Sequence, residues 1–212
     1  MLFRSWERFS YYGIRGLLVL FLTASAANGG MQWHADSALQ LLGWFAALVY
    51  MLPVLGGLCG DRLIGSTRSV RVGTAILIVA YALLAASAWL QQSLHASAQC
   101  AAASQSNLPS TLCGAAGHAR LTSTLMFTAL TLIAIGTGLF KPNITALVGR
   151  LYEKNDPARE GGFLIFYLFM NIGVVLCGLV IGTLGERVAW HFGFLAACVA
   201  MMFSAVVFAR SR

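Results

Sequence analysis

Six apolar stretches divide this sequence, and each is long enough to cross a lipid bilayer as a helix. A transmembrane helix needs about 20 predominantly apolar residues, and such windows lie near 8–28, 38–60, 70–92, 122–149, 163–183 and 191–209. Only 10% of the 212 residues are charged, whereas soluble domains carry about 25% charged residues. The sequence therefore predicts an all-α, polytopic membrane protein in which residues 1–212 form one bundle of six transmembrane helices.

Basic residues are unevenly distributed over the segments that join these windows. Ten of the fourteen Lys and Arg fall on one side of the membrane if successive windows alternate in direction: Arg4, Arg8, Arg62, Arg68, Arg71, Arg150, Lys154, Arg159, Arg210 and Arg212. The other side has Arg120 and Arg187. Because short loops rich in Lys and Arg stay in the cytoplasm, we expect a multi-pass protein of a bacterial inner membrane with both termini cytoplasmic. This pattern accounts for the net charge of +7 without a nucleic-acid partner.

The first window opens on a polar stretch that a membrane helix rarely carries. On a helix, five of its residues share an arc of about 140°: Glu7, Arg8, Tyr11, Tyr12 and Arg15. One interpretation of Arg4, Trp6 and Arg8 is that they anchor the helix at the lipid headgroups. Arg15 lies about two turns inside the apolar run, so it needs an internal partner or a water-filled cavity. An intramembrane charge of this kind indicates a functional site.

A second cation, Lys141, lies in the cytoplasmic half of the window near 122–149. The following Pro142 removes a helical hydrogen bond beside this charge. Lys141 could extend to the inner interface, but a carboxylate partner is the stronger expectation. Glu7 is the one acid near the inner half of a predicted helix rather than in a loop. We therefore predict that Glu7 and Lys141 form an ion pair.

Two further polar residues lie inside apolar windows. Tyr50 precedes Pro53, so its phenol faces a predicted bend, and Asn171 continues a helical stripe with Phe163 and Tyr167. An amide in a membrane helix needs a hydrogen-bond partner. A structural bond between helices and a role in ligand binding both satisfy that need for Asn171.

The segment near 93–121 is predicted to be a periplasmic loop. It contains Cys100 and Cys113, which could form a disulfide in an oxidising compartment or remain free. Together with His95 and His118 their spacing fits no standard zinc pattern, so we expect no metal. The sequence also shows no nucleophile paired with a base, so we do not expect an enzyme.

Four motifs carry a resemblance to known transporters. The first, with Gly57, Asp61, Arg62 and Gly65, resembles the conformational loop of the major facilitator superfamily, whose fold is two six-helix halves. The other three are Glu7-Arg8-Phe9-Ser10-Tyr11-Tyr12-Gly13, Gly138-Leu139-Phe140-Lys141-Pro142-Asn143 and Phe166-Tyr167-Leu168-Phe169-Met170-Asn171-Ile172-Gly173. In this order they resemble the proton-dependent oligopeptide transporter family, and the likeness covers nearly the whole chain outside 91–121.

This resemblance implies proton-coupled symport of di- and tripeptides by alternating access, with the proton as coupling ion and no cofactor. It assigns substrate binding to six residues: Arg15, Tyr11, Tyr12, Tyr50, Lys141 and Asn171. It assigns proton coupling to Glu7, Arg8 and Lys141. The family usually has a second glutamate three residues before the one that matches Glu7, and this chain has Arg4 there.

The resemblance also predicts that these six helices are the N-terminal half of the transporter fold. Alternating access is largely a rocking of one half against another around a midplane site. The chain would then work with a separate C-terminal half or in a homodimer. The alternative is a truncated fragment that does not transport.

Overall fold

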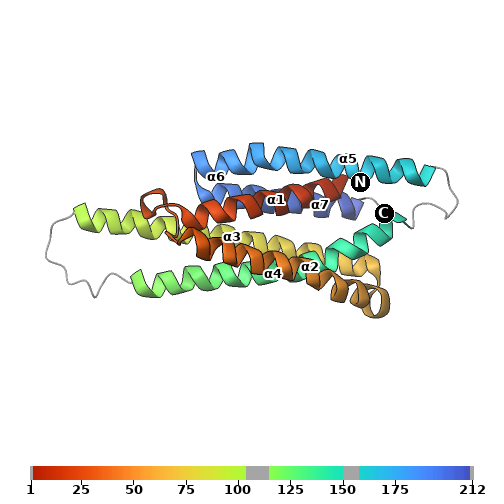
Figure 1. The fold of residues 1–212 in the computed structure, drawn as a ribbon, viewed down its shortest axis with the longest axis horizontal. Coiled ribbons are helices and arrows are strands. Elements are labelled where there is room, and N and C mark those ends of the chain that lie inside the picture. Colours follow the sequence, from red (N-terminus) through yellow and green to blue (C-terminus); the bar gives the residue numbers. More distant parts are fainter. Residues whose placement is uncertain (1, 104–114, 150–157, 211–212) are drawn as a thin grey trace.

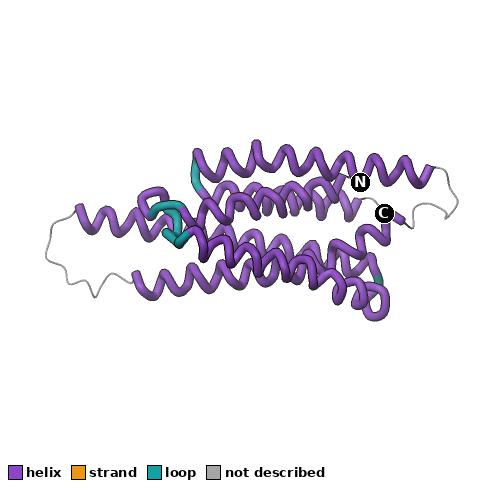
Figure 2. Tube along the Cα trace, viewed as in Figure 1, coloured by secondary structure: helices purple, strands orange, loops and turns teal. Residues whose placement is uncertain are grey.

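The computed structural model describes residues 2–103, 115–149 and 158–210, and in these ranges the chain is almost entirely helical without strands (Figure 2). The elements in chain order are α1 (Leu2–Thr23), the 3-10 helix η1 (Ala26–Asn28), α2 (Ala35–Cys59), the π-helical turn η2 (Gly60–Ile64), α3 (Ser66–Ala103), α4 (Ala115–Gly149), α5 (Ala158–Cys177), the π-helical turn η4 (Gly178–Gly182), α6 (Thr183–Arg187) and α7 (Trp190–Arg210). Helices satisfy every backbone hydrogen bond within one segment, which is what a bilayer requires.

Five helical segments are long and apolar enough to cross a membrane by length and composition. They are Ala35–Ile64, Ser66–Leu94, Arg120–Gly149, Glu160–Arg187 and Trp190–Arg210. The first predicted window corresponds to α1, which has 22 residues but carries Arg4, Glu7, Arg8 and Arg15. The all-helical fold is thus confirmed for the described residues, while the sixth span stays a prediction.

Helix α1 lies inside the bundle and is covered on several sides. It packs against α7 and α5, while α3 packs along α4 and α7, and α2 packs along α4 (Figure 1). Much of the apolar half of α1 is buried, with Leu18, Phe21 and Leu22 at 0% exposure, while Leu20 on the opposite face is 42% exposed. The start of α1 and the end of α7 lie at the same end of the bundle (Figure 1). This burial allows a helix with charged residues to be held by its neighbours rather than by lipid.

Helices α2 and α4 meet at a close crossing made by glycines. A Cβ on Gly56 would overlap the backbone carbonyl of Gly138, and a Cβ on Gly60 would overlap the amide of Asn143. Asn143 is 1% exposed, and its Nδ2 donates to the Gly56 carbonyl at 3.1 Å and to the Leu139 carbonyl at 2.8 Å. Small residues let membrane helices approach in this way. The crossing fixes α4 where it carries Lys141.

Replacing Gly56 by alanine should therefore destabilise the bundle. Overpacking a close contact costs about 1–3 kcal/mol, so the thermal unfolding temperature of the purified protein in detergent should fall. Gly43→Ala in the same helix is the matched control, because a Cβ there meets nothing within 4 Å. Equal unfolding temperatures for the two variants would contradict the crossing.

Two connections differ from the predicted loops. Helical structure continues through η2 to Ile64, and the reversal into α3 is made at Gly65, whose φ of +85° favours glycine. The helices also extend into the segment near 93–121, because α3 runs to Ala103 and α4 begins at Ala115. Polar composition suggested loops here, but Ala-rich and Ser-rich segments can continue a helix outside the apolar core.

Candidate functional site

A cavity of about 370 Å³ lies between α1, α2, α4 and α5. Its walls come from four helices that are far apart in the sequence: Arg8, Tyr12, Tyr50, Pro53, Lys141, Met170, Asn171 and Val174. Four of the six residues predicted to bind substrate are in this set, namely Tyr12, Tyr50, Lys141 and Asn171. The predicted coupling residue Arg8 is there as well. The cavity is therefore lined by two cations, two phenols and an amide.

The ammonium of Lys141 lies against aromatic rings. Its Nζ is 4.6 Å from the ring centroid of Tyr50 and 5.4 Å from that of Tyr11. A cation within about 6 Å of a ring face is attracted by the ring quadrupole. Within the part of the chain that the structure describes, no carboxylate lies within 4 Å of this ammonium. The arrangement leaves Lys141 able to receive an anionic group in the cavity.

Tyr11 and Arg15 do not line the cavity. Tyr11 is 1% exposed and packs edge-on against Tyr12, with ring centroids 5.3 Å apart, so it supports the wall from behind. Arg15 is half-buried and follows Arg8 and Tyr12 on the same face of α1, about one turn further along. The described bundle brings Lys141 and Arg8 to this cavity but leaves Arg15 outside it.

The buried carboxylate of Glu7 is paired with arginines. Its side chain has 0% exposure, and Oε2 lies 3.6 Å from Arg8 Nε and 4.0 Å from Arg4 Nε. The predicted ion pair between Glu7 and Lys141 is absent from the interactions of the described residues. The guanidiniums that reach Glu7 belong to the same helix, with Arg8 at i+1 and Arg4 at i−3. The sequence prediction considered only a partner on another helix. Arg4 is also 5% exposed, which argues against the interpretation that it anchors the helix at the lipid headgroups.

Helix α5 contributes one narrow face to the cavity, formed by Met170, Asn171 and Val174. Asn171 Nδ2 donates to the Tyr167 carbonyl of its own helix at 3.0 Å. This bond joins neither another helix nor a ligand, so it does not decide between the two interpretations of the amide. Met170 and Val174 were not predicted to line a site. The available signal was the spacing of Val174, which lies at i+3 from Asn171 and at i+4 from Met170, because residues so spaced share a helix face.

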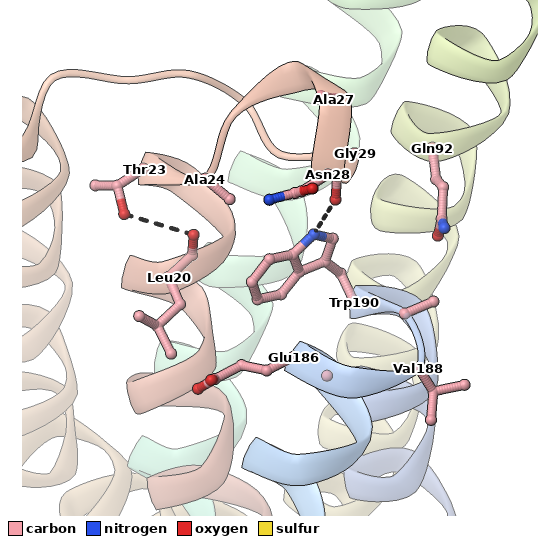
Figure 3. Close-up of a pocket in the computed structure, with 12 residues that line it drawn as sticks. Leu20, Thr23, Ala24, Ala27, Asn28, Gly29, Gln92, Glu186, Val188 and Trp190 are labelled. Atoms are coloured by element: carbon pink, nitrogen blue, oxygen red, sulfur yellow. Dashed lines mark hydrogen bonds between the residues drawn. The ribbon is translucent and has the colours of Figure 1, made fainter.

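A second cavity of about 650 Å³ lies at the other end of α1. Figure 3 shows its walls, where the Trp190 indole Nε1 donates to the Asn28 carbonyl at 2.7 Å. Glu186 from α6 and Gln92 from α3 also line it (Figure 3). None of the residues predicted to bind substrate or couple protons lies on its walls.

The structure does not test whether Cys100 and Cys113 form a disulfide or remain free, since Cys113 and the side chain of Cys100 lie outside the described residues. The same holds for the side chains of His95, His118 and Asp61. Two residues of the predicted conformational loop can be placed. A Cβ added to Gly57 would lie 3.5 Å from Pro142 Cβ on α4, and Arg62 is exposed. The loop signature therefore lies beside the α2–α4 crossing.

Comparison with known proteins finds relatives that are transporters. The POT family profile matches residues 67–212. The chain is 34% identical over 207 residues to "Uncharacterized transporter YclF" of Bacillus subtilis (strain 168), covering 98% of this chain and 35% of that protein. It is 34% identical over 201 residues to the "Di-/tripeptide transporter" of Lactococcus lactis subsp. cremoris, covering 94% of this chain and 34% of that protein.

A solved structure extends this likeness to the fold. The crystal structure of peptide transporter POT in complex with sulfate superposes with a TM-score of 0.81 at 33% identity, over 100% of this chain and 36% of that one. The chain thus spans about a third of the length of the curated relatives that it matches. The matched profile, the sequence identity and the shared fold agree, and the chain belongs to the POT family.

Proposed function

We propose that this chain is the N-terminal six-helix part of a proton-coupled symporter of di- and tripeptides in a bacterial inner membrane. The observation that carries the proposal is the Lys141 cavity, where an ammonium without a carboxylate partner among the described residues faces two tyrosines and an amide. A peptide offers a carboxylate for the cation and backbone groups for the phenols and the amide. Charge-assisted hydrogen bonds in a low-dielectric cavity are the strong ones.

The proton-accepting group in this proposal is Glu7. It is the fully buried carboxylate nearest to the cavity wall formed by Arg8. Taking up a proton would cancel its attraction to the neighbouring guanidiniums, and losing the proton would restore it. Such a change can bias two conformations only if the two bind the proton with different affinity. The same group then links the proton gradient to the state of the helices around the cavity.

Helices α2 and α5 offer the surface for the remaining part of the transporter. Their most apolar windows are only 17% and 22% buried inside this bundle, whereas those of α3 and α4 are 50% buried. Both exposed helices also line the cavity. A second helical bundle against them would close the cavity and supply the opposite wall. A homodimer would use the same surface, and a truncated fragment would leave it to lipid.

The proposal is tested in a chimera in which residues 1–212 replace the matching third of the Lactococcus lactis transporter. Reconstituted in liposomes with an inward proton gradient, the chimera should accumulate a labelled dipeptide, and an unlabelled tripeptide should compete. Free amino acids should compete weakly, because they lack the peptide backbone between the two charges. A folded chimera that takes up no peptide would contradict the proposed function.

The proposed orientation follows from the Lys and Arg in the segments that join the apolar windows. If Arg4 and Arg8, which pair with Glu7, are left out of the count, eight Lys and Arg still fall on the proposed cytoplasmic side against Arg120 and Arg187. In a cysteine-free background, an impermeant maleimide added to intact cells should label Ala27→Cys. Arg68→Cys should react only after the membrane is opened, since both positions are exposed but face opposite sides. The reverse pattern would invert the topology.

A further inference from the structure

Arg4 joins three helices beneath the Lys141 cavity. Its Nη1 donates to the Lys141 carbonyl on α4 at 3.2 Å, and its Nε lies 3.4 Å from Met170 Sδ on α5. Its Cζ is 5.5 Å from the centroid of the Phe166 ring. The side chain is almost completely buried. A guanidinium in this position contacts both the helix that carries Lys141 and the helix that carries the opposite wall.

The same guanidinium is one of two counter-ions of Glu7. Arg4 Nε and Arg8 Nε both approach Oε2 of Glu7, at 4.0 and 3.6 Å. A charge buried away from water is tolerated only when it is paired. Since two cations already surround this single carboxylate, a third cation approaching it would be repelled by both.

The ammonium of Lys141 is directed elsewhere, toward the Tyr50 ring and the cavity. We propose that Arg4 is a positioning residue that takes the place of Lys141 as a counter-ion of Glu7 and so holds the Lys141 ammonium in the cavity. In this chain, Glu7, which takes up the proton, and Lys141, which receives the substrate, are then not paired with each other. The inference rests on the proposed function only in naming Lys141 as the substrate cation.

The state of Lys141 can be measured without transport, by the rate at which an amine-reactive acylating reagent modifies it in the purified chain. The sequence has one other lysine, Lys154, which serves as the internal reference in the same mass spectrum. At fixed pH, Glu7→Gln should leave the relative rate at Lys141 within about twofold of wild type, because the two groups are not paired. A several-fold increase in Glu7→Gln would show that Glu7 holds Lys141 and would overturn the proposal.

Removing Arg4, by contrast, should slow the labelling of Lys141. In Arg4→Gln, Lys141 should turn to Glu7 and react about fivefold more slowly, a factor typical of one ion pair within a charge network. The double variant Arg4→Gln with Glu7→Gln should recover the wild-type rate. Arg4→Lys, which keeps the charge, should react as wild type does.

An unchanged rate in Arg4→Gln, or a double variant as slow as the single one, would overturn the proposal. If Arg4→Gln does not fold, Glu7→Gln and Arg4→Lys decide the question, since slow labelling in Arg4→Lys or fast labelling in Glu7→Gln contradicts it. Phe166→Leu is the matched control, because it removes the ring contact of Arg4 without altering any charge, and Phe166 does not line the cavity. Labelling of Lys141 at the wild-type rate in this control variant, together with slow labelling in Arg4→Gln, would support the inference even if the chimera transported nothing.

Discussion

Peptide uptake by the chimera should fall by at least about tenfold when Lys141 is replaced by alanine, because hydrogen bonds to a charged group contribute about 1.5–3 kcal/mol. The ammonium lines the cavity and has no carboxylate partner among the described residues. Its loss would leave the substrate carboxylate with Arg8 as the only cation on the described cavity wall. The measurement is the initial rate of labelled dipeptide uptake in liposomes at equal protein density.

Two control variants separate this effect from misfolding and from general loss of charge. Lys141→Arg keeps the cation and should retain more of the uptake than Lys141→Ala does. Arg68→Ala removes an exposed cation that is not part of the cavity wall, and it should transport as the parent chimera does. Near-normal uptake by Lys141→Ala would mean that the substrate carboxylate binds elsewhere.

Residues 1–212 reconstituted alone should accumulate no dipeptide, and supplying the rest of the transporter as a separate polypeptide should restore uptake. The described cavity wall contains no Asp or Glu, so the positively charged amino terminus of a peptide has no partner there. Alternating access also requires a second bundle against which the first can rock. Residues 1–212 alone should give background accumulation of the dipeptide, and the two parts together should give gradient-driven accumulation.

Accumulation by these residues alone would contradict the need for a second part. It would point instead to a homodimer in which the exposed faces of α2 and α5 meet their own copies. Leu48 on α2 is exposed in this bundle. A disulfide crosslink between two copies of the Leu48→Cys variant would then distinguish the dimer from a monomer. The background is set with liposomes that contain the Lys141→Ala variant.

The sequence predicted the residues of the Lys141 cavity better than it predicted the ion pairs. The resemblance to the transporter family assigned Tyr12, Tyr50, Lys141 and Asn171 to one pocket, and the fold brings these four together. The error concerned the partner of Lys141, for which Glu7 was chosen as the one acid near the inner half of a predicted helix. Which of several cations reaches a carboxylate depends on rotamers and helix contacts that a sequence pattern does not contain.

Helix α1 shows why the membrane spans were only partly predictable. Its apolar residues Leu17 to Leu22 fit a span, yet the helix begins at Leu2 and ends at Thr23, earlier than the window near 8–28 indicated. Hydropathy marks lipid-facing segments, whereas the first turns of α1 are buried by protein. Three of the four charges that lower its hydropathy, Arg4, Glu7 and Arg8, form the ion pairs of Glu7, and Arg8 also lines the cavity.

The most direct measurement is the position at which a photoreactive dipeptide becomes attached to the chimera. A dipeptide with a light-activated side chain is irradiated in the liposomes, and the modified residues are identified by mass spectrometry with and without excess unlabelled dipeptide. The account predicts competed modification of the cavity walls on α2 and α5, at Tyr50, Met170 or Val174. Competed modification confined to the second cavity, at Gln92, Glu186 or Trp190, would contradict it.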